Sequence, residues 1–269
     1  ALAGFLRRGG AFPCFAKPIR GSVGGGGAAI TGYAAATDRL ELANGETVPV
    51  DAFVADLERP DRGKIAHAGY LFQDLIDQHP AITAVAGPTV STARIVVLVG
   101  DDDVTPLTAI WRVARAGNMT DNFDKGRSGN LIAAVELEHG EVTRVASGYG
   151  LKQSLVERHP DTGHELGGFR LPDWKQALES CIAGAPSFPN LRFQHWDVAF
   201  SRRGPVVLPG REPEEAVAQQ LLAAVVDDDD LRDRRAVDLE EGQAPGIGRP
   251  PERLPPPVED LLVVHPVGL

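Results

Sequence analysis

Cysteine is scarce in this sequence, which has only Cys14 and Cys181 among its 269 residues. Two cysteines do not form a disulfide framework, and no cysteine–histidine pattern with zinc-ligand spacing accompanies them. The sequence also has no uninterrupted apolar run near the ~18 residues that cross a bilayer, and its start has no signal-peptide pattern. These absences predict a cytoplasmic protein without membrane insertion.

Positive charge is also in short supply. The sequence has 27 lysines and arginines against 37 acidic residues, so its formal net charge is −10. Nucleic acids and anionic membranes recruit an excess of lysine and arginine because their phosphates are negative. We therefore expect no nucleic-acid partner. The hydrophobic content of 43% is enough for a core in one large domain or two small ones.

Aromatic residues are absent after Phe200. That segment holds 10 of the 21 prolines, 14 acidic residues against 8 arginines, the run DDDD at 227–230 and the run RPPERLPPP at 249–257. Aromatic side chains contribute large buried areas, so a stretch without them builds a core poorly. We expect an atypical tail over 209–269 that is partly helical, at 213–226, and otherwise extended or disordered.

The sequence before this tail mixes strand and helix patterns. Residues 93–99 (ARIVVLV) are the clearest strand, apolar and β-branched, and are expected to be buried on both faces. Residues 174–183 (WKQALESCIA) space their apolar side chains at helical intervals. Further strands are predicted at 28–42, before the turn Asn44-Gly45, and at 53–57, 69–76, 107–114, 131–137, 193–200 and 206–208. The fold class is therefore α+β.

A glycine-rich stretch follows one of the few lysines, in FAKPIRGSVGGGG at 15–27. Glycine allows close backbone approach to a ligand, and successive amides beside a lysine can hold an anion such as phosphate. The stretch is not a G-x-x-x-x-G-K-[ST] loop, and its glycines precede strand-like sequence instead of a helix. It is either a flap that closes over a triphosphate or a flexible surface hairpin.

Several blocks in a fixed order support the first interpretation. The order resembles the sugar-transfer-associated branch of the ATP-grasp superfamily, relatives of glutamate-ligase-like carboxylate–amine ligases, over roughly 12–208. The blocks are FAKPIRGSVGGGG, LFQDLIDQHP, PTVSTARIVVLV, GNMTDNFDKG, RHPDTGHELGGFRLPDW and FPNLRFQHWDVAFSRRGPVVL. The resemblance implies an ATP-grasp fold, in which two α+β subdomains sandwich a nucleotide, with ATP and Mg²⁺ as cofactors. It implies a nucleotide-flap subdomain at 1–83, a C-terminal subdomain at 84–208, and an N-terminal domain that is expected to be missing here.

The resemblance also assigns nucleotide-binding residues. It implies that Lys17 binds phosphates, that a flap covers them, and that an extended backbone segment pairs with adenine. The flap residues are Ser22, Gly24, Gly25, Gly26 and Gly27, and the adenine segment is Gln73, Asp74, Leu75 and Ile76. An extended backbone supplies the donor and acceptor that the adenine edge needs. The alternatives are a solvated strand-end lysine and an ordinary surface strand.

Three further positions carry candidate chemistry. A guanidinium is costly to bury unpaired, and the resemblance implies that Arg94 is a catalytic contact to phosphate or acyl-phosphate; a salt bridge is the alternative. Two-residue alternation places His195 and Asp197 on one strand face. The resemblance implies that Asp197 binds magnesium, whereas a hydrogen-bonded strand carboxylate is the alternative. Asp121 and Asn122 either line the acceptor pocket or form an Asx turn.

The resemblance fails at the second metal carboxylate. The family typically has L-E-G-N where this chain has Leu208-Pro209-Gly210-Arg211, and Mg²⁺ requires oxygen ligands. We therefore expect weak or absent ligase activity toward an unknown carboxylate and an amine or sugar-linked acceptor, in a pathway of cell-surface polysaccharide assembly. The alternative is a non-catalytic nucleotide-binding or partner-binding module, either an evolved pseudoenzyme or a truncated or frameshifted fragment.

Overall fold

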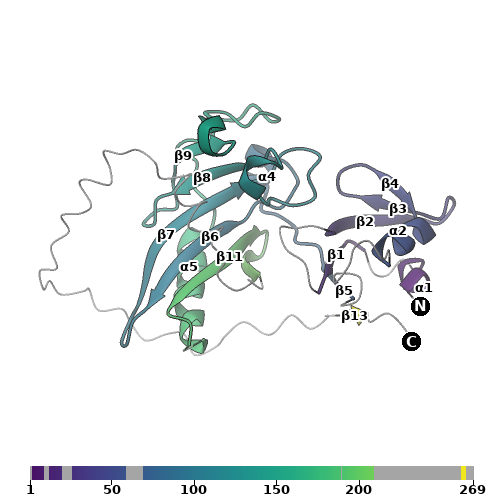
Figure 1. Cartoon of the computed structure of the whole chain (residues 1–269), viewed down its shortest axis with the longest axis horizontal. Helices are drawn as coiled ribbons and strands as arrows, with labels where there is room; N and C mark the ends of the chain where they lie inside the picture. Colours follow the sequence, from purple (N-terminus) through teal and green to yellow (C-terminus); the bar gives the residue numbers. More distant parts are fainter. Residues whose placement is uncertain are drawn as a thin grey trace, which may run out of the picture.

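The computed structural model describes residues 2–8, 12–19, 26–58, 69–188, 190–208 and 262–264 of the chain. These residues form two antiparallel sheets with a few helices (Figure 1), so the predicted α+β class is confirmed. The flap residues Ser22, Gly24 and Gly25, the predicted helix at 213–226 and the family-signature positions 209–211 lie outside the described residues.

The first sheet contains Lys17 and the first two residues, Gln73 and Asp74, of the segment predicted to pair with adenine. Its strand order is β13-β5-β1-β2-β3-β4. The strands are β1 (Cys14–Pro18), β2 (Ala28–Ala34), β3 (Arg39–Leu42), β4 (Thr47–Pro49), β5 (Tyr70–Asp74) and β13 (Leu262–Val264). Helices α1 (Leu2–Leu6) and α2 (Val50–Leu57) bury Leu6, Phe53 and Leu57 in one core with Ala16 and Phe72 of the sheet. Alternation along β1 therefore directs Lys17 to the opposite face.

The second sheet is larger and carries the charged candidates. Its strand order is β10-β9-β8-β7-β6-β11-β12. The strands are β6 (Ala93–Val99), β7 (Val104–Val113), β8 (Leu131–Val135), β9 (Val142–Ser147), β10 (Ser154–Leu155), β11 (Phe193–Ser201) and β12 (Gly204–Leu208). Helix α5 (Trp174–Gly184) packs against one face, where Ala177 and Cys181 join Ile95, Trp111 and Val198 in the core. Short 3-10 helices follow or link these elements: η2 (Asp124–Gly126), η3 (Gly150–Lys152) and η4 (Ala185–Ser187).

The two sheets are joined by a fixed segment around helix α4 (Pro80–Ala86). The side chain of His79 accepts a hydrogen bond from the Ala81 N–H and caps this helix. The His79 N–H donates to the Phe200 carbonyl at 2.8 Å, and Gln78 forms an isolated bridge with Ser201. The chain that follows β5 is therefore held against the end of β11. This junction sets the spacing between the adenine segment and the charged face of the second sheet.

Three local predictions differ from the structure. Residues 53–57 are the end of helix α2 and not a strand, because Val50, Phe53 and Leu57 repeat at helical spacing and are buried together. Helix α4 was not predicted. Strand β6 is buried on both faces only in part, since Leu98 is 41% exposed on the face opposite α5.

Candidate functional site

The charged candidates lie on the face of the second sheet that points away from α5. Ile95, Val97 and Val198 belong to the core with α5, so the alternate residues Arg94 and Asp197 point to the other side. These two residues are directly opposite each other in the β6–β11 register. Strand pairing thus brings together two positions that are 103 residues apart in the sequence.

Arg94 and Asp197 form a bidentate ion pair. Arg94 Nε donates to Asp197 Oδ1 at 2.7 Å, and Arg94 Nη2 donates to Oδ2 at 2.9 Å. Arg112 Nη2 approaches Asp197 Oδ2 at 3.1 Å. Burial works to raise the pKa of Asp197, but Arg112 and Arg94 together lower it below its ordinary value. Asp197 is therefore a carboxylate shared by two guanidinium groups.

A second carboxylate completes the network on the other side of Arg112. Asp121 Oδ2 accepts hydrogen bonds from the Thr92 N–H at 2.8 Å and from Thr92 Oγ1 at 2.5 Å. Arg112 Nε lies 3.4 Å from Asp121 Oδ2 and donates to Thr92 Oγ1 at 3.1 Å. Two guanidinium groups thus face two carboxylates. The network is largely buried. Its two positive and two negative charges balance, which compensates the cost of burying them.

The adenine segment presents its backbone groups in an alternating order. The Leu75 N–H donates to the Pro13 carbonyl at 3.3 Å, and Gln73 is opposite Phe15 of β1. Because alternate residues of a strand direct their N–H and C=O groups to opposite sides, those of Asp74, the last residue of β5, point away from β1. On that side, the described pairing with β13 covers only Tyr70 to Phe72. The Asp74 carbonyl is thus an acceptor at the outer edge, and the chain continues from it through Leu75 and Ile76.

Lys17 lies on β1, and the described part of the predicted flap, Gly26 and Gly27, leads into the neighbouring strand β2. Lys17 is opposite Leu71 of β5, on the face of the first sheet away from α1 and α2. Gly26 precedes β2 with φ of 81°, a conformation that favours glycine over other residues. Gly27 leads directly into β2.

A family model for sugar-transfer associated ATP-grasp proteins matches residues 14–234 of the chain. The chain belongs to this family. The suspected ATP-grasp resemblance is therefore confirmed, and the two antiparallel sheets agree with an ATP-grasp fold. A search of curated proteins found no match. None of the described helices is both long and apolar enough to cross a membrane.

ATP-grasp proteins generally use ATP and Mg²⁺, and the charged face of the second sheet holds the carboxylate that the resemblance assigns to magnesium. Mg²⁺ takes oxygen ligands in near-octahedral geometry. Both oxygens of Asp197 already accept hydrogen bonds from guanidinium groups, and Asp121 Oδ2 is occupied by Thr92. Two arginines at this point also repel a divalent cation. The described residues in this arrangement do not fit a bound Mg²⁺.

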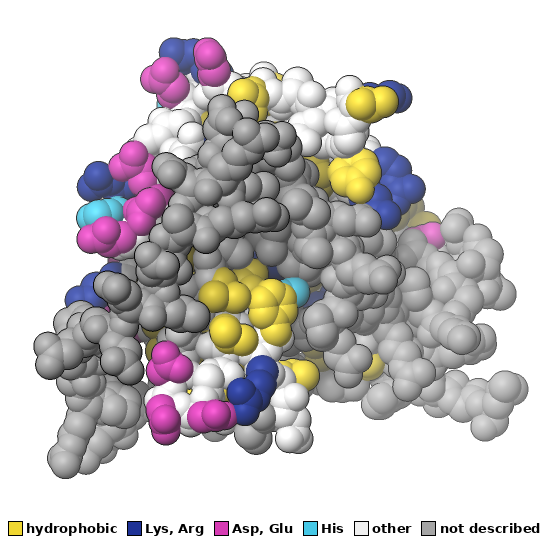
Figure 2. Space-filling view, turned by 60° about the vertical axis from the view of Figure 1, so that its left-hand side comes forward, with side chains coloured by type: hydrophobic (Ala, Val, Ile, Leu, Met, Phe, Trp, Pro, Cys, Tyr) yellow, Lys and Arg dark blue, Asp and Glu magenta, His cyan; other side chains and the backbone are white. Residues whose placement is uncertain are grey.

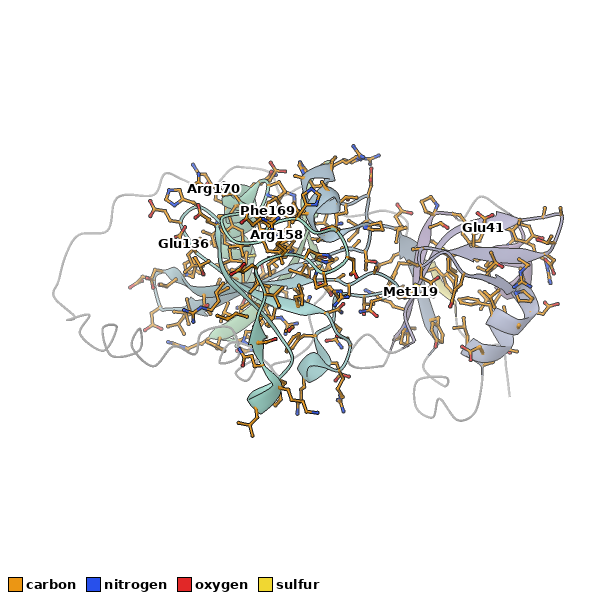
Figure 3. The ribbon with its side chains drawn as sticks, turned by 90° about the horizontal axis from the view of Figure 1, so that it is seen from above. Glu41, Met119, Glu136, Arg158, Phe169 and Arg170 are labelled. Atoms are coloured by element: carbon orange, nitrogen blue, oxygen red, sulfur yellow. The ribbon has the colours of Figure 1, made fainter. Side chains whose placement is uncertain are left out.

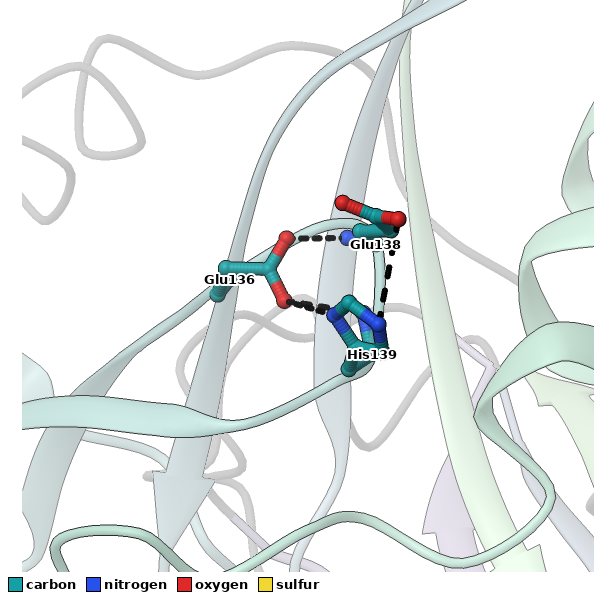
Figure 4. Close-up of side chains that lie close together, drawn as sticks. All are labelled: Glu136, Glu138 and His139. Carbon is teal, nitrogen blue, oxygen red and sulfur yellow. Dashed lines mark hydrogen bonds and ion pairs between the residues drawn. The ribbon is translucent and has the colours of Figure 1, made fainter.

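One other group of potential metal ligands occurs among the described residues, at the β8–β9 turn. Glu136, Glu138 and His139 are exposed. They lie close together (Figure 4), and Figure 3 labels Glu136 in the view of the whole chain. The Glu136 carboxylate accepts hydrogen bonds from the backbone N–H groups of Glu138 and His139. Burial raises the pKa of Glu136, but these N–H groups outweigh it and lower the pKa overall. This carboxylate therefore organises a turn, which accounts for the cluster without a metal.

The two predicted acceptor residues lie in the loop before η2. Oδ2 of Asp121 accepts hydrogen bonds from Thr92 and lies 3.4 Å from Arg112 Nε, so this oxygen is held by the buried network. The Asn122 carbonyl accepts from Asn130 Nδ2 at 2.8 Å. Both residues therefore support the loop that carries Phe123, whose ring is buried on Ile132 and Ala146.

His195 lies two residues from Asp197 on the same face and was given no role from the sequence. Its Nε2 is the one buried side-chain nitrogen or oxygen without a hydrogen-bond partner in the part of the chain that the structure describes. Burial and the positive charge of Arg94 lower its pKa, against the opposing effect of Asp197, so the imidazole is neutral at pH 7. The Phe193 ring packs edge-on against the imidazole, with 5.0 Å between the ring centroids. Phe193 and Leu98 are exposed large apolar residues, and Figure 2 shows a histidine beside such side chains.

Proposed function

We propose that this chain binds ATP between its two sheets. The adenine edge pairs with the Asp74 carbonyl and the Ile76 N–H. The phosphates lie over Lys17 and reach Arg94, and the glycine flap covers them. The observation that carries this proposal is the outward-facing backbone of Asp74 at the end of β5, on the side not taken by β1.

The spacing along β11 supports this placement. The chain after the adenine segment is joined to β11 at Ser201, four residues from Asp197. At the rise of an extended strand this distance is about 13 Å. Arg94 lies directly opposite Asp197. A triphosphate that extends from the adenine segment along β11 therefore reaches the guanidinium of Arg94.

The reaction that we propose for a complete member of this family is carboxylate–amine ligation. A substrate carboxylate attacks the γ-phosphorus of ATP, the bond to the bridging oxygen breaks, and ADP leaves. An amine or a sugar-linked nucleophile then attacks the acyl-phosphate carbon, and phosphate and a proton are released. Arg94 would neutralise the transferring phosphoryl group. We place such a reaction in the cytoplasm, in cell-surface polysaccharide assembly, with no nucleic-acid partner.

For this chain we propose little or no ligase turnover, because the described residues do not fit a protein-held Mg²⁺. A second candidate function is therefore a non-catalytic nucleotide-binding or partner-binding module, favoured by the internal pairing of both Asp197 oxygens and of Asp121 Oδ2. Calorimetric titration with a non-hydrolysable ATP analogue, with and without Mg²⁺, should show binding in both conditions. ADP release with Mg²⁺ and candidate acceptors should stay at the buffer rate; sustained release would favour the ligase.

Replacement of Ile76 tests the adenine contact. Ile76→Pro removes the N–H that we assign to adenine and still accepts extended backbone. Loss of one hydrogen bond of about 1–1.5 kcal/mol should weaken ATP binding about five- to tenfold and leave inorganic tripolyphosphate binding unchanged. Ile76→Val, which keeps the N–H, is the matched control. Wild-type ATP affinity in a folded Ile76→Pro variant would refute the assignment.

A further inference from the structure

Arg94 offers its guanidinium to a carboxylate in the way it would offer it to a phosphate. Its Nε and Nη2 groups donate in parallel to the two oxygens of Asp197, at 2.7 and 2.9 Å. Carboxylates and phosphates both accept such paired bonds from arginine. Asp197 and a ligand phosphate therefore require the same two N–H groups of Arg94.

The two arginines differ in how firmly they are held. Arg112 is buried and is bound to Thr92, Asp121 and Asp197 together. The side chain of Arg94 is 17% exposed, and Asp197 is its one ion-pair partner among the described residues. A ligand at this face would therefore displace Asp197 from Arg94, while Arg112 keeps Asp197 in place.

We infer that Asp197 is an internal stand-in for the ligand's phosphate and competes with it for Arg94, and that it is not a magnesium ligand. The inference rests on the proposed function only in taking this face as the phosphate end of the site. The ligand class is a polyphosphate that binds without a metal held by the protein. Loss of the negative charge at Asp197 should therefore improve polyphosphate binding, whereas loss of a metal ligand should not.

The test measures binding of inorganic tripolyphosphate by calorimetry in EDTA. Asp197→Asn should bind it about threefold to tenfold more tightly than the wild type, because Arg94 is then free of its competing anion. Arg94→Ala in the Asp197→Asn background should abolish this gain. Asp101→Asn is the matched control, since Asp101, in the β6–β7 turn, forms an exposed ion pair with Arg192, which precedes β11. Asp197→Ser removes the same charge in a smaller side chain and serves if the asparagine variant does not fold.

A metal titration adds a second readout. Mn²⁺ binding followed by electron paramagnetic resonance should give the same stoichiometry for the wild type and Asp197→Asn. One additional Mn²⁺ in the wild type would overturn the inference, as would unchanged or weaker tripolyphosphate binding by Asp197→Asn. If the wild type binds tripolyphosphate but not ATP, the adenine assignment fails and this inference stands. If no variant binds tripolyphosphate, both fail.

Discussion

Arg112→Leu is expected to lower the free energy of unfolding by about 3–5 kcal/mol, the cost of breaking a buried ion pair from one side. Arg112 joins the two halves of the charged network, since it contacts Asp121, Thr92 and Asp197. Without it, Asp197 keeps only the guanidinium of Arg94, and Asp121 keeps only its hydrogen bonds from Thr92. Leucine fills part of the volume but supplies no hydrogen-bond donor. The free energy lost with the hydrogen bonds to the buried carboxylates therefore exceeds the free energy gained from leucine packing.

Urea denaturation at pH 7 measures this loss. Arg202→Leu is the control, because Arg202 pairs with Asp77 at an exposed position and its loss should cost no more than about 1 kcal/mol. Equal effects of the two substitutions would show that the network contributes little to stability. A further variant is Asp121→Asn, which keeps the shape of the side chain and removes its negative charge. It should make Arg112→Leu less costly, because the two residues are coupled.

The elements of the fold were predictable where a local pattern was long enough. Strand β6 is a continuous apolar run, and helix α5 repeats its apolar residues over three turns, so both were predicted close to their observed bounds. Helix α2 was missed because the window 53–57 is shorter than two helical turns. Its period becomes visible only when Val50 is included, the first of the three residues that pack on the first sheet.

The candidate site was predictable only in part, because it depends on which strands pair. Alternation along one strand placed His195 and Asp197 on a common face, but it could not identify β6 as the partner of β11 or set Arg94 opposite Asp197. Arg112 was overlooked, although an arginine within the apolar strand 107–114 was a usable signal, since a buried guanidinium needs an anion. That the Leu75 N–H points inward to β1 likewise follows only from the register with that strand.

His195→Leu is expected to raise the free energy of unfolding by about 1–3 kcal/mol at pH 7.5, the cost of an unpaired buried polar group. The buried Nε2 of His195 has no partner among the described residues, and leucine removes that atom beside the apolar Phe193. A stabilising substitution at this position would mean that the wild type retains an unsatisfied nitrogen for a purpose other than folding. Its place next to Asp197 and Arg94 points to contact with a ligand group.

The gain should also depend on pH, with a sign that follows from the lowered pKa of His195. Burial, the largest cause, and Arg94 disfavour the charged imidazole in the folded state, so the unfolded chain binds the extra proton first. The stability due to neutral His195 is therefore complete above the ordinary pKa of 6.5 and decreases as the pH falls below it. The advantage of His195→Leu should thus be larger at pH 5.5 than at pH 7.5. His164→Leu, at an exposed histidine, is the matched control for loss of an imidazole. A His195→Leu variant that is less stable than the wild type would show that Nε2 has a hydrogen-bond partner in solution. A stability gain that is smaller at pH 5.5 than at pH 7.5 would show the same.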